Sequence, residues 1–138
     1  MKRRRLTPKE KRFLARERVI RVATAGRDGA PHVVPVCHAL DGNEIYFGTG
    51  RRARKARNIA QTRRVSLVAD RYSENWPGLR GVSIAGRARL IASGPAFARA
   101  RQLLYGKFPQ YKHEAYALEP GESVIVRVTP VRVMSWGL

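Results

Sequence analysis

The sequence has few of the residues that form disulfides, metal sites or acid–base pairs. Its 138 residues include one cysteine, three histidines and ten Asp plus Glu. A single cysteine forms no internal disulfide, which agrees with a reducing compartment. The shortage of carboxylates leaves no recognisable pair for general acid–base catalysis.

Long hydrophobic runs are also missing. No apolar stretch approaches the roughly 18 residues that a membrane helix needs. The basic run of residues 1–5 is not followed by the apolar stretch and cleavage site of a secretory signal. We therefore expect a cytoplasmic, soluble protein. The length fits a single domain, residues 1–138, with one core.

Positive charge is abundant. Lys plus Arg number 28, which gives a formal net charge of +18. Such a surface attracts nucleic acid, nucleotide-like cofactors and anionic lipid. Arginine is spread over nearly every segment, so genomic composition explains the charge as well as a binding surface does.

Alternating apolar residues and turn signals predict a mainly β fold. Thr7 and Glu10 form a capping-box pattern before the first helix, and Gly86 marks a bulge or bend in the fifth strand. Hairpins dominate, which favours a closed antiparallel barrel with inserted helices, an α+β architecture. We expect six strands, over residues 19–25, 32–40, 44–49, 65–69, 82–91 and 123–136, and helices over residues 8–18, 52–61 and 93–105.

The junction between the third strand and the second helix is the most informative segment. A turn containing Gly48 and Gly50 leads into a helix whose early residues include Arg54 and Lys55. Free backbone N–H groups, the positive helix end and two cations together suit a phosphate monoester. A solvated basic helix face is the competing interpretation.

The order of these segments resembles the pyridoxamine 5'-phosphate oxidase-like superfamily of FMN-binding split barrels. Within it, the chain is most similar to the short actinobacterial branch that uses the deazaflavin coenzyme F420. The resemblance spans nearly the whole chain and is carried by residues 21–24, 29–36, 45–49, 54–59, 64–67 and 82–90.

The resemblance implies a homodimeric split β-barrel with a flat tricyclic cofactor in each of two clefts at the subunit interface. It further implies an oxidoreductase that transfers hydride to or from a small organic substrate, with chemistry supplied by the cofactor. The implied cofactor-binding residues are Ala23 and Thr24 at the ring, Pro35 and Val36 beside it, Gly48 and Thr49 along the ribityl chain, Arg54, Lys55 and Asn58 at the phosphate, and Trp136, reaching the cleft from the other subunit.

Two departures from the family pattern narrow the expected activity. Gly81 stands where oxidases of this superfamily place a glutamine, and their extended C-terminal substrate-binding segment is missing. Oxidation of pyridoxamine phosphate is therefore not expected. Coenzyme F420 is the first choice of cofactor and FMN the second, since the phosphate motif suits both.

A metal site is not expected from His32, Cys37 and His38. Neighbours on a strand point to opposite faces, and His32 and His38 are about 20 Å apart at roughly 3.3 Å per residue. We interpret Cys37 as a small buried side chain rather than a nucleophile, and His113 as a surface residue.

Two alternatives to an enzyme remain at this stage. In a nucleic-acid-binding domain, residues 51–64 would track phosphates, and Tyr105, Phe108 and Tyr111 would stack on bases. In a non-catalytic carrier, the same cleft would hold a flavin or deazaflavin without turnover.

Overall fold

The computed structural model describes residues 3–138; Met1 and Lys2, which begin the basic N-terminal run, lie outside the described residues. Six strands and three α-helices confirm the expected architecture, and the three short 3-10 turns η1 to η3 are additional. In chain order the elements are α1 (Pro8–Arg16), β1 (Val19–Ala25), β2 (Pro31–Asp41), β3 (Glu44–Gly50), α2 (Arg54–Thr62), β4 (Arg64–Arg71), η1 (Trp76–Gly78), β5 (Arg80–Ile91), α3 (Gly94–Lys107), η2 (Pro109–Lys112), η3 (Glu114–Tyr116) and β6 (Ser123–Trp136).

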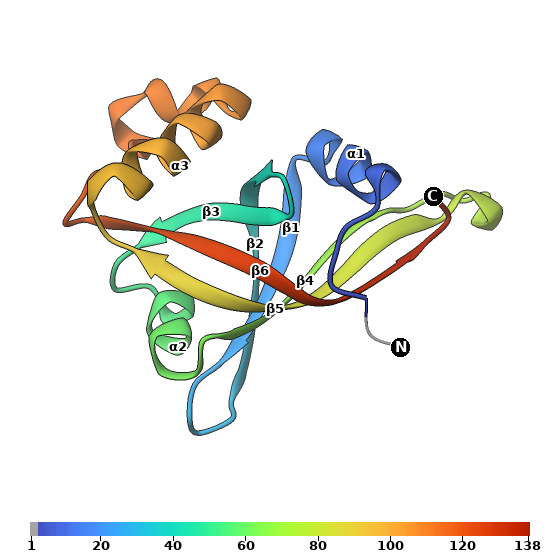
Figure 1. Cartoon of the computed structure of the whole chain (residues 1–138), viewed down its shortest axis with the longest axis horizontal. Coiled ribbons are helices and arrows are strands. Elements are labelled where there is room, and N and C mark those ends of the chain that lie inside the picture. Colours follow the sequence, from blue (N-terminus) through green and yellow to red (C-terminus); the bar gives the residue numbers. More distant parts are fainter. Residues whose placement is uncertain (1–2) are drawn as a thin grey trace.

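The strands form one closed antiparallel barrel in the order β1-β2-β3-β6-β5-β4 (Figure 1). Short turns join β1 to β2 and β2 to β3, and Gly29 and Gly42 supply the positive φ angles that these turns require. The register of β5 against β6 shifts between Ala85 and Gly86, which confirms the bulge expected at Gly86.

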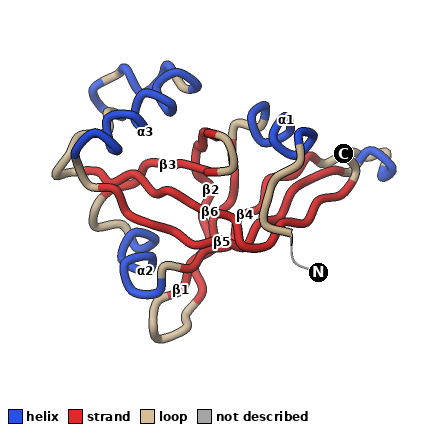
Figure 2. Tube along the Cα trace, in the orientation of Figure 1, coloured by secondary structure: helices blue, strands red, loops and turns tan. Residues whose placement is uncertain are grey.

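Two helices pack on opposite sides of the barrel (Figure 2). The capping box of Thr7 and Glu10 starts α1, which buries Phe13 and Leu14 in the main core. Helix α2 contributes Ile59 to the same core. These two helices therefore complete the core of the barrel and leave part of its outer surface uncovered. None of the helices in residues 3–138 is long and apolar enough to span a bilayer.

A second apolar cluster lies outside the barrel, where α3 covers β2, β3 and β6. Phe97 and Leu104 of α3 pack there against Ile125. The ring of Tyr105 stacks on Tyr111 at 5.4 Å, and Phe108 is buried. The three rings that the nucleic-acid alternative assigned to base stacking thus pack against one another.

The prediction that Cys37 is buried is wrong. Along β2 the side chains of Pro35 and Cys37 are exposed, whereas those of Val36 and His38 are buried. The alternation of a strand confirms that Cys37 and His38 face opposite sides. Sequence alone did not show which side faces water.

Candidate functional site

The first turn of α2 is open to an anion. Its N-cap residue, Ala53, supplies no side-chain acceptor, and no acidic residue lies in the first turn. Arg54 is exposed, and burial lowers the pKa of the partly buried Lys55. A hollow of about 320 Å³ lies directly before the helix, lined by Gly50, Arg51, Arg52, Ala53 and Glu122. Uncapped N–H groups and two adjacent cations are suited to a phosphate.

One row of polar side chains fixes α2 against β1. Lys55, Asn58 and Thr62 are spaced three and four residues apart, so they share one helix face. Asn58 Nδ2 donates to Thr24 Oγ1 at 3.1 Å, and Thr62 Oγ1 donates to the Ala25 carbonyl at 3.0 Å. Lys55 therefore lies one turn from a buried seam that ties α2 to β1. In this chain the hydroxyl of Thr24 is engaged by Asn58.

A groove of about 450 Å³ runs along the outer face of the barrel beside this seam. Arg64 of β4 pairs in register with Arg87 of β5, so two guanidinium groups flank the groove. Its remaining lining is mostly small or uncharged: Ala23, Thr24, Ala25, Gly26, Pro31, Thr62, Val65, Ser66, Ala85, Gly86 and Val131.

The strand registers extend this flat surface across five strands. One cross-strand row consists of Val33, Ala23, Ser66, Ala85 and Arg132. Ala23, Ser66 and Ala85 alternate along their strands with buried neighbours, and Val33 is 64% exposed. A flat molecule can approach the backbone closely over such a row, because only short side chains project from its centre.

Four expected ring and ribityl contacts are divided between the two faces of the barrel. Pro35 is exposed on the outer face, but the side chains of Val36 and Thr49 point into the core. Gly48 faces outward beneath Leu118, since a Cβ at Gly48 would lie 2.6 Å from Leu118 Cδ2. Val36, Thr49 and Gly48 can therefore contact an outer-face ligand chiefly through their backbone.

Trp136 lies far from the other expected site residues of the same chain. It pairs with Gly81 at the end of the β4–β5 hairpin, whereas Arg87 marks the end beside α2. Arg87 follows Gly81 by six positions, which is about 20 Å along the strand at roughly 3.3 Å per residue. Trp136 can thus reach a ligand at α2 only from a second copy of the chain.

Sequence reasoning missed the contribution of the β4–β5 hairpin. Arg64, Ser66, Ala85 and Arg87 line the same groove as Ala23 and Thr24. Local signals did not fix the register of β4 against β5, because residues 72–79, which include η1, connect β4 to β5. The pairing of β1 with β4, which brings this hairpin beside Ala23, follows only from barrel closure.

The buried imidazole of His38 is a structural group. Its Nε2–H donates to the Leu14 carbonyl at 2.8 Å, and Nδ1 has no partner. Burial, followed by the charge of Lys107, lowers the pKa of His38 to about 4. Residues 3–138 hold no cluster of three or more potential metal ligands.

Comparison with known proteins places these features in context. Residues 6–137 match the model of the pyridoxamine 5'-phosphate oxidase family. The 5a,11a-dehydrotetracycline/5a,11a-dehydrooxytetracycline reductase of Streptomyces rimosus subsp. rimosus is 33% identical over 137 residues, which covers 96% of this chain and 83% of the reductase.

Solved structures share the same architecture. The conserved hypothetical protein Rv2991 of Mycobacterium tuberculosis is 26% identical, with a TM-score of 0.80 over 95% of this chain and 84% of that protein. A structure described as an F420 reductase is 21% identical, with a TM-score of 0.69 over 94% of this chain and 98% of its own. At that identity the second likeness concerns the fold.

Proposed function

Because the chain belongs to the pyridoxamine 5'-phosphate oxidase family, we propose that it binds coenzyme F420, with FMN as second choice, and acts as a hydride-transferring oxidoreductase. The observation that carries this proposal is the uncapped start of α2 with its cations Arg54 and Lys55, on a helix that Asn58 ties to Thr24, the neighbour of Ala23 in the flat row of small side chains. The first feature suits a phosphate and the second a planar ring.

Each group of residues has a distinct task in this proposal. Arg54 offers a planar fork to two phosphate oxygens, and Lys55 adds a compact charge. Asn58 holds the helix on Thr24, so that both cations keep their position. Ala23 and Pro35 border the ring on the outer face, and the backbone of Val36, Gly48 and Thr49 lies along the rest of the cofactor.

The preference for the deazaflavin rests on two similarities. A relative with 33% identity is a reductase, and one solved structure of the same fold is described as an F420 reductase. Both cofactors carry a tricycle, a ribityl chain and a phosphate, so the site residues suit either. The basic surface of this chain also favours F420, the more anionic of the two cofactors.

We also propose that the protein is a homodimer. The outer face of β1 and β2 exposes the apolar side chains of Val19 and Val33. A second copy would bury this face and close the groove from above. It would also bring its Trp136 to the cofactor, which one chain alone cannot do.

The bound cofactor supplies the hydride chemistry, and the chain supplies position and charge. Residues lining the outer groove include no histidine, carboxylate, tyrosine or cysteine. The groove itself therefore offers no conventional proton donor. The guanidinium groups of Arg64 and Arg87 would stabilise negative charge on a ligand in this groove.

Direct titration tests the phosphate site. Purified protein is titrated with F420 and with FMN, and cofactor fluorescence reports binding. We expect Arg54→Ala and Lys55→Ala each to weaken binding by about tenfold or more, since a charge-assisted contact contributes roughly 1.5–3 kcal/mol. Arg57→Ala is the matched control, because Arg57 is an exposed cation on the same helix. Absence of saturable binding of either cofactor would refute the assignment.

A non-catalytic carrier is the second candidate, favoured by the lack of a proton donor in the groove. The two functions differ in turnover. An enzyme oxidises reduced F420 when a conjugated acceptor such as 5a,11a-dehydrooxytetracycline is added, whereas a carrier binds the reduced cofactor with no rate above the protein-free control.

A further inference from the structure

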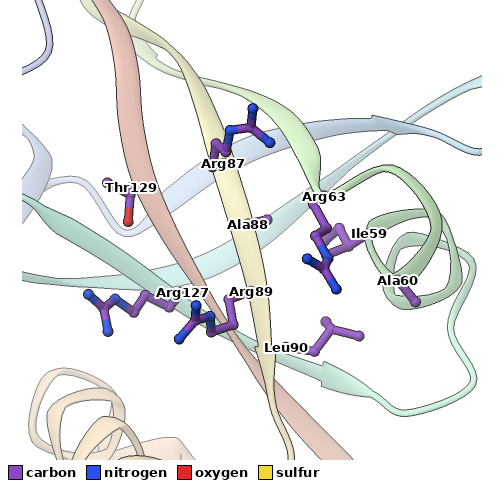
Figure 3. Close-up of a pocket in the computed structure, with 9 residues that line it drawn as sticks. All are labelled: Ile59, Ala60, Arg63, Arg87, Ala88, Arg89, Leu90, Arg127 and Thr129. Atoms are coloured by element: carbon purple, nitrogen blue, oxygen red, sulfur yellow. The ribbon is translucent and has the colours of Figure 1, made fainter.

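A further cavity, of about 580 Å³, lies where the C-terminal end of α2 meets β5 and β6, and it shares Arg87 with the outer groove (Figure 3). Four arginines from three elements line it: Arg63 after α2, Arg87 and Arg89 on β5, and Arg127 on β6. Figure 3 shows Arg63 on the α2 side of β5, and Arg89 with Arg127 on the β6 side. The positive charge is thus spread along the cavity rather than focused at one point.

Little negative charge within residues 3–138 compensates these guanidinium groups. Arg127 Nε lies 3.6 Å from Glu44, whose carboxylate also accepts from Thr129 Oγ1 at 2.6 Å. Arg63, Arg87 and Arg89 form no ion pair within 4 Å in the described chain, and no carboxylate lines the cavity. Four like charges around one hollow repel each other, and a bound anion would relieve this repulsion.

Arg63 has a backbone conformation that residues other than glycine rarely adopt. Arg63 has φ 58° and ψ 24°, the left-handed region in which helices commonly end on glycine. Its N–H donates to the Ile59 carbonyl and its own carbonyl accepts from Ala88 N–H, so α2 and β5 fix the residue from both sides. An arginine therefore occupies a site where glycine would be less strained.

We propose that this cavity binds a small molecule that carries several negatively charged oxyanion groups, phosphate or carboxylate. The volume lies within the range of small-molecule sites. The other lining residues are Ile59, Ala60, Ala88, Leu90 and Thr129. This lining contains no aromatic ring on which a nucleobase could stack, which favours a compact anion over a nucleic-acid strand.

Calorimetric titration with inorganic triphosphate and with triglutamate tests the proposal and distinguishes phosphate from carboxylate ligands. We expect saturable binding of at least one probe at physiological ionic strength. Arg89→Gln and Arg63→Gly should each raise the Kd by about tenfold. Arg57→Gln, which removes an exposed charge from α2 outside the cavity, should leave the Kd nearly unchanged. Glycine suits the backbone at position 63, so the Arg63→Gly variant is expected to fold.

Two further arms separate this cavity from other basic surfaces. The titrations are repeated with Lys55→Ala, because Arg54 and Lys55 are themselves proposed to bind a phosphate: a triphosphate bound at the start of α2 loses affinity in this variant, whereas one bound in the cavity loses affinity in Arg89→Gln. The proposal is overturned if neither probe binds, if Arg57→Gln weakens binding as much as Arg89→Gln, or if Lys55→Ala weakens binding and Arg89→Gln does not. Tighter binding of an oligothymidylate, with equal sensitivity to Arg57→Gln, would overturn it in favour of a diffuse nucleic-acid surface.

Discussion

The side chains of Asn58 and Thr24 form a hydrogen bond across the buried seam between α2 and β1, in which Asn58 Nδ2 donates to Thr24 Oγ1 at 3.1 Å. Both residues are less than one-tenth exposed. The helix that presents Arg54 and Lys55 is therefore positioned by a pair of polar side chains that water does not reach.

Removing one member of this pair should cost more than removing both. Asn58→Ala leaves the Thr24 hydroxyl buried without its donor, and we expect a loss of roughly 1–3 kcal/mol in the free energy of unfolding. Urea unfolding of Asn58→Ala, Thr24→Val and the double variant measures the coupling. Strictly additive losses would show that the hydrogen bond does not hold α2 on β1.

Acid should destabilise the protein through His38. Burial, with the charges of Lys107 and Arg18, lowers its pKa to about 4 from an ordinary 6.5. The unfolded chain then binds a proton at higher pH than the folded protein. The free energy of unfolding should fall as the pH drops from about 6.5 to about 4, by at most about 3 kcal/mol.

Urea unfolding across this pH range checks the prediction. His38→Gln should flatten the dependence, because an amide does not titrate, whereas His32→Gln is the matched control on the same strand. Glu10 affects stability only at lower pH. Burial raises its pKa, but hydrogen bonds, chiefly from Arg3, lower the pKa to about 2 from an ordinary 4.5. The free energy of unfolding that ionised Glu10 contributes is therefore lost only below about pH 4.5. If the free energy of unfolding falls equally with pH in the wild type and in His38→Gln, His38 is excluded as the cause of the acid destabilisation.

The effects of substitutions at Gly81 and Trp136 on stability should be coupled, because the two residues pack closely. A Cβ at Gly81 would collide with the Trp136 ring and lie 2.9 Å from the Ala69 carbonyl oxygen. We expect Gly81→Ala to destabilise the protein by roughly 1–3 kcal/mol. Adding Trp136→Ala should recover part of this loss, and thermal unfolding of the three variants checks it. The indole thus fills space that a larger residue at position 81 would need.

Position 63 should prefer glycine for stability. Arg63 has a left-handed backbone, which costs any residue with a Cβ roughly 1 kcal/mol. Arg63→Gly and Arg63→Ala both remove the charge, but only glycine removes the strain. We expect Arg63→Gly to be the more stable variant by about that amount in urea unfolding. A less stable glycine variant would contradict the left-handed assignment.

A charge on the outer face should prevent dimerisation. Val33 is 64% exposed, so Val33→Lys leaves the folded chain intact while placing an ammonium group in the proposed interface. We expect light scattering at micromolar concentration to give a dimer for the wild type and a monomer for this variant. Tyr116→Lys, equally exposed on η3, is the control. A monomeric wild type with cofactor bound would contradict the dimer.

Local sequence patterns predicted the elements because their signals are local. The first strand has the predicted bounds, Val19–Ala25, and the capping box of Thr7 and Glu10 starts α1 as expected. The first helix ends at Arg16, two residues earlier than predicted, where the chain turns into β1. The bulge at Gly86 was predictable because few other residues tolerate such close approach.

The site was less predictable because it depends on contacts between distant segments. Nothing near Gly48 indicates that Leu118 covers it, and nothing near Arg64 indicates that β4 lies beside Ala23. The exposure of Cys37 likewise depends on which face of β2 the barrel encloses. The second helix has a local signal: it begins at Arg54, two residues later than predicted, so Arg54 and Lys55 lie in its first turn.

Closure of the barrel by β6 requires contacts between residues that are distant in the sequence. This strand joins β3, through pairs such as Gly50 with Ser123, to β5. Contacts between such distant residues form slowly, so we expect refolding in milliseconds to seconds. Until β6 docks, β3 and β5 present open edges that other chains can pair with. The step that completes the barrel is therefore also the step at which concentrated, refolding protein is most prone to aggregate.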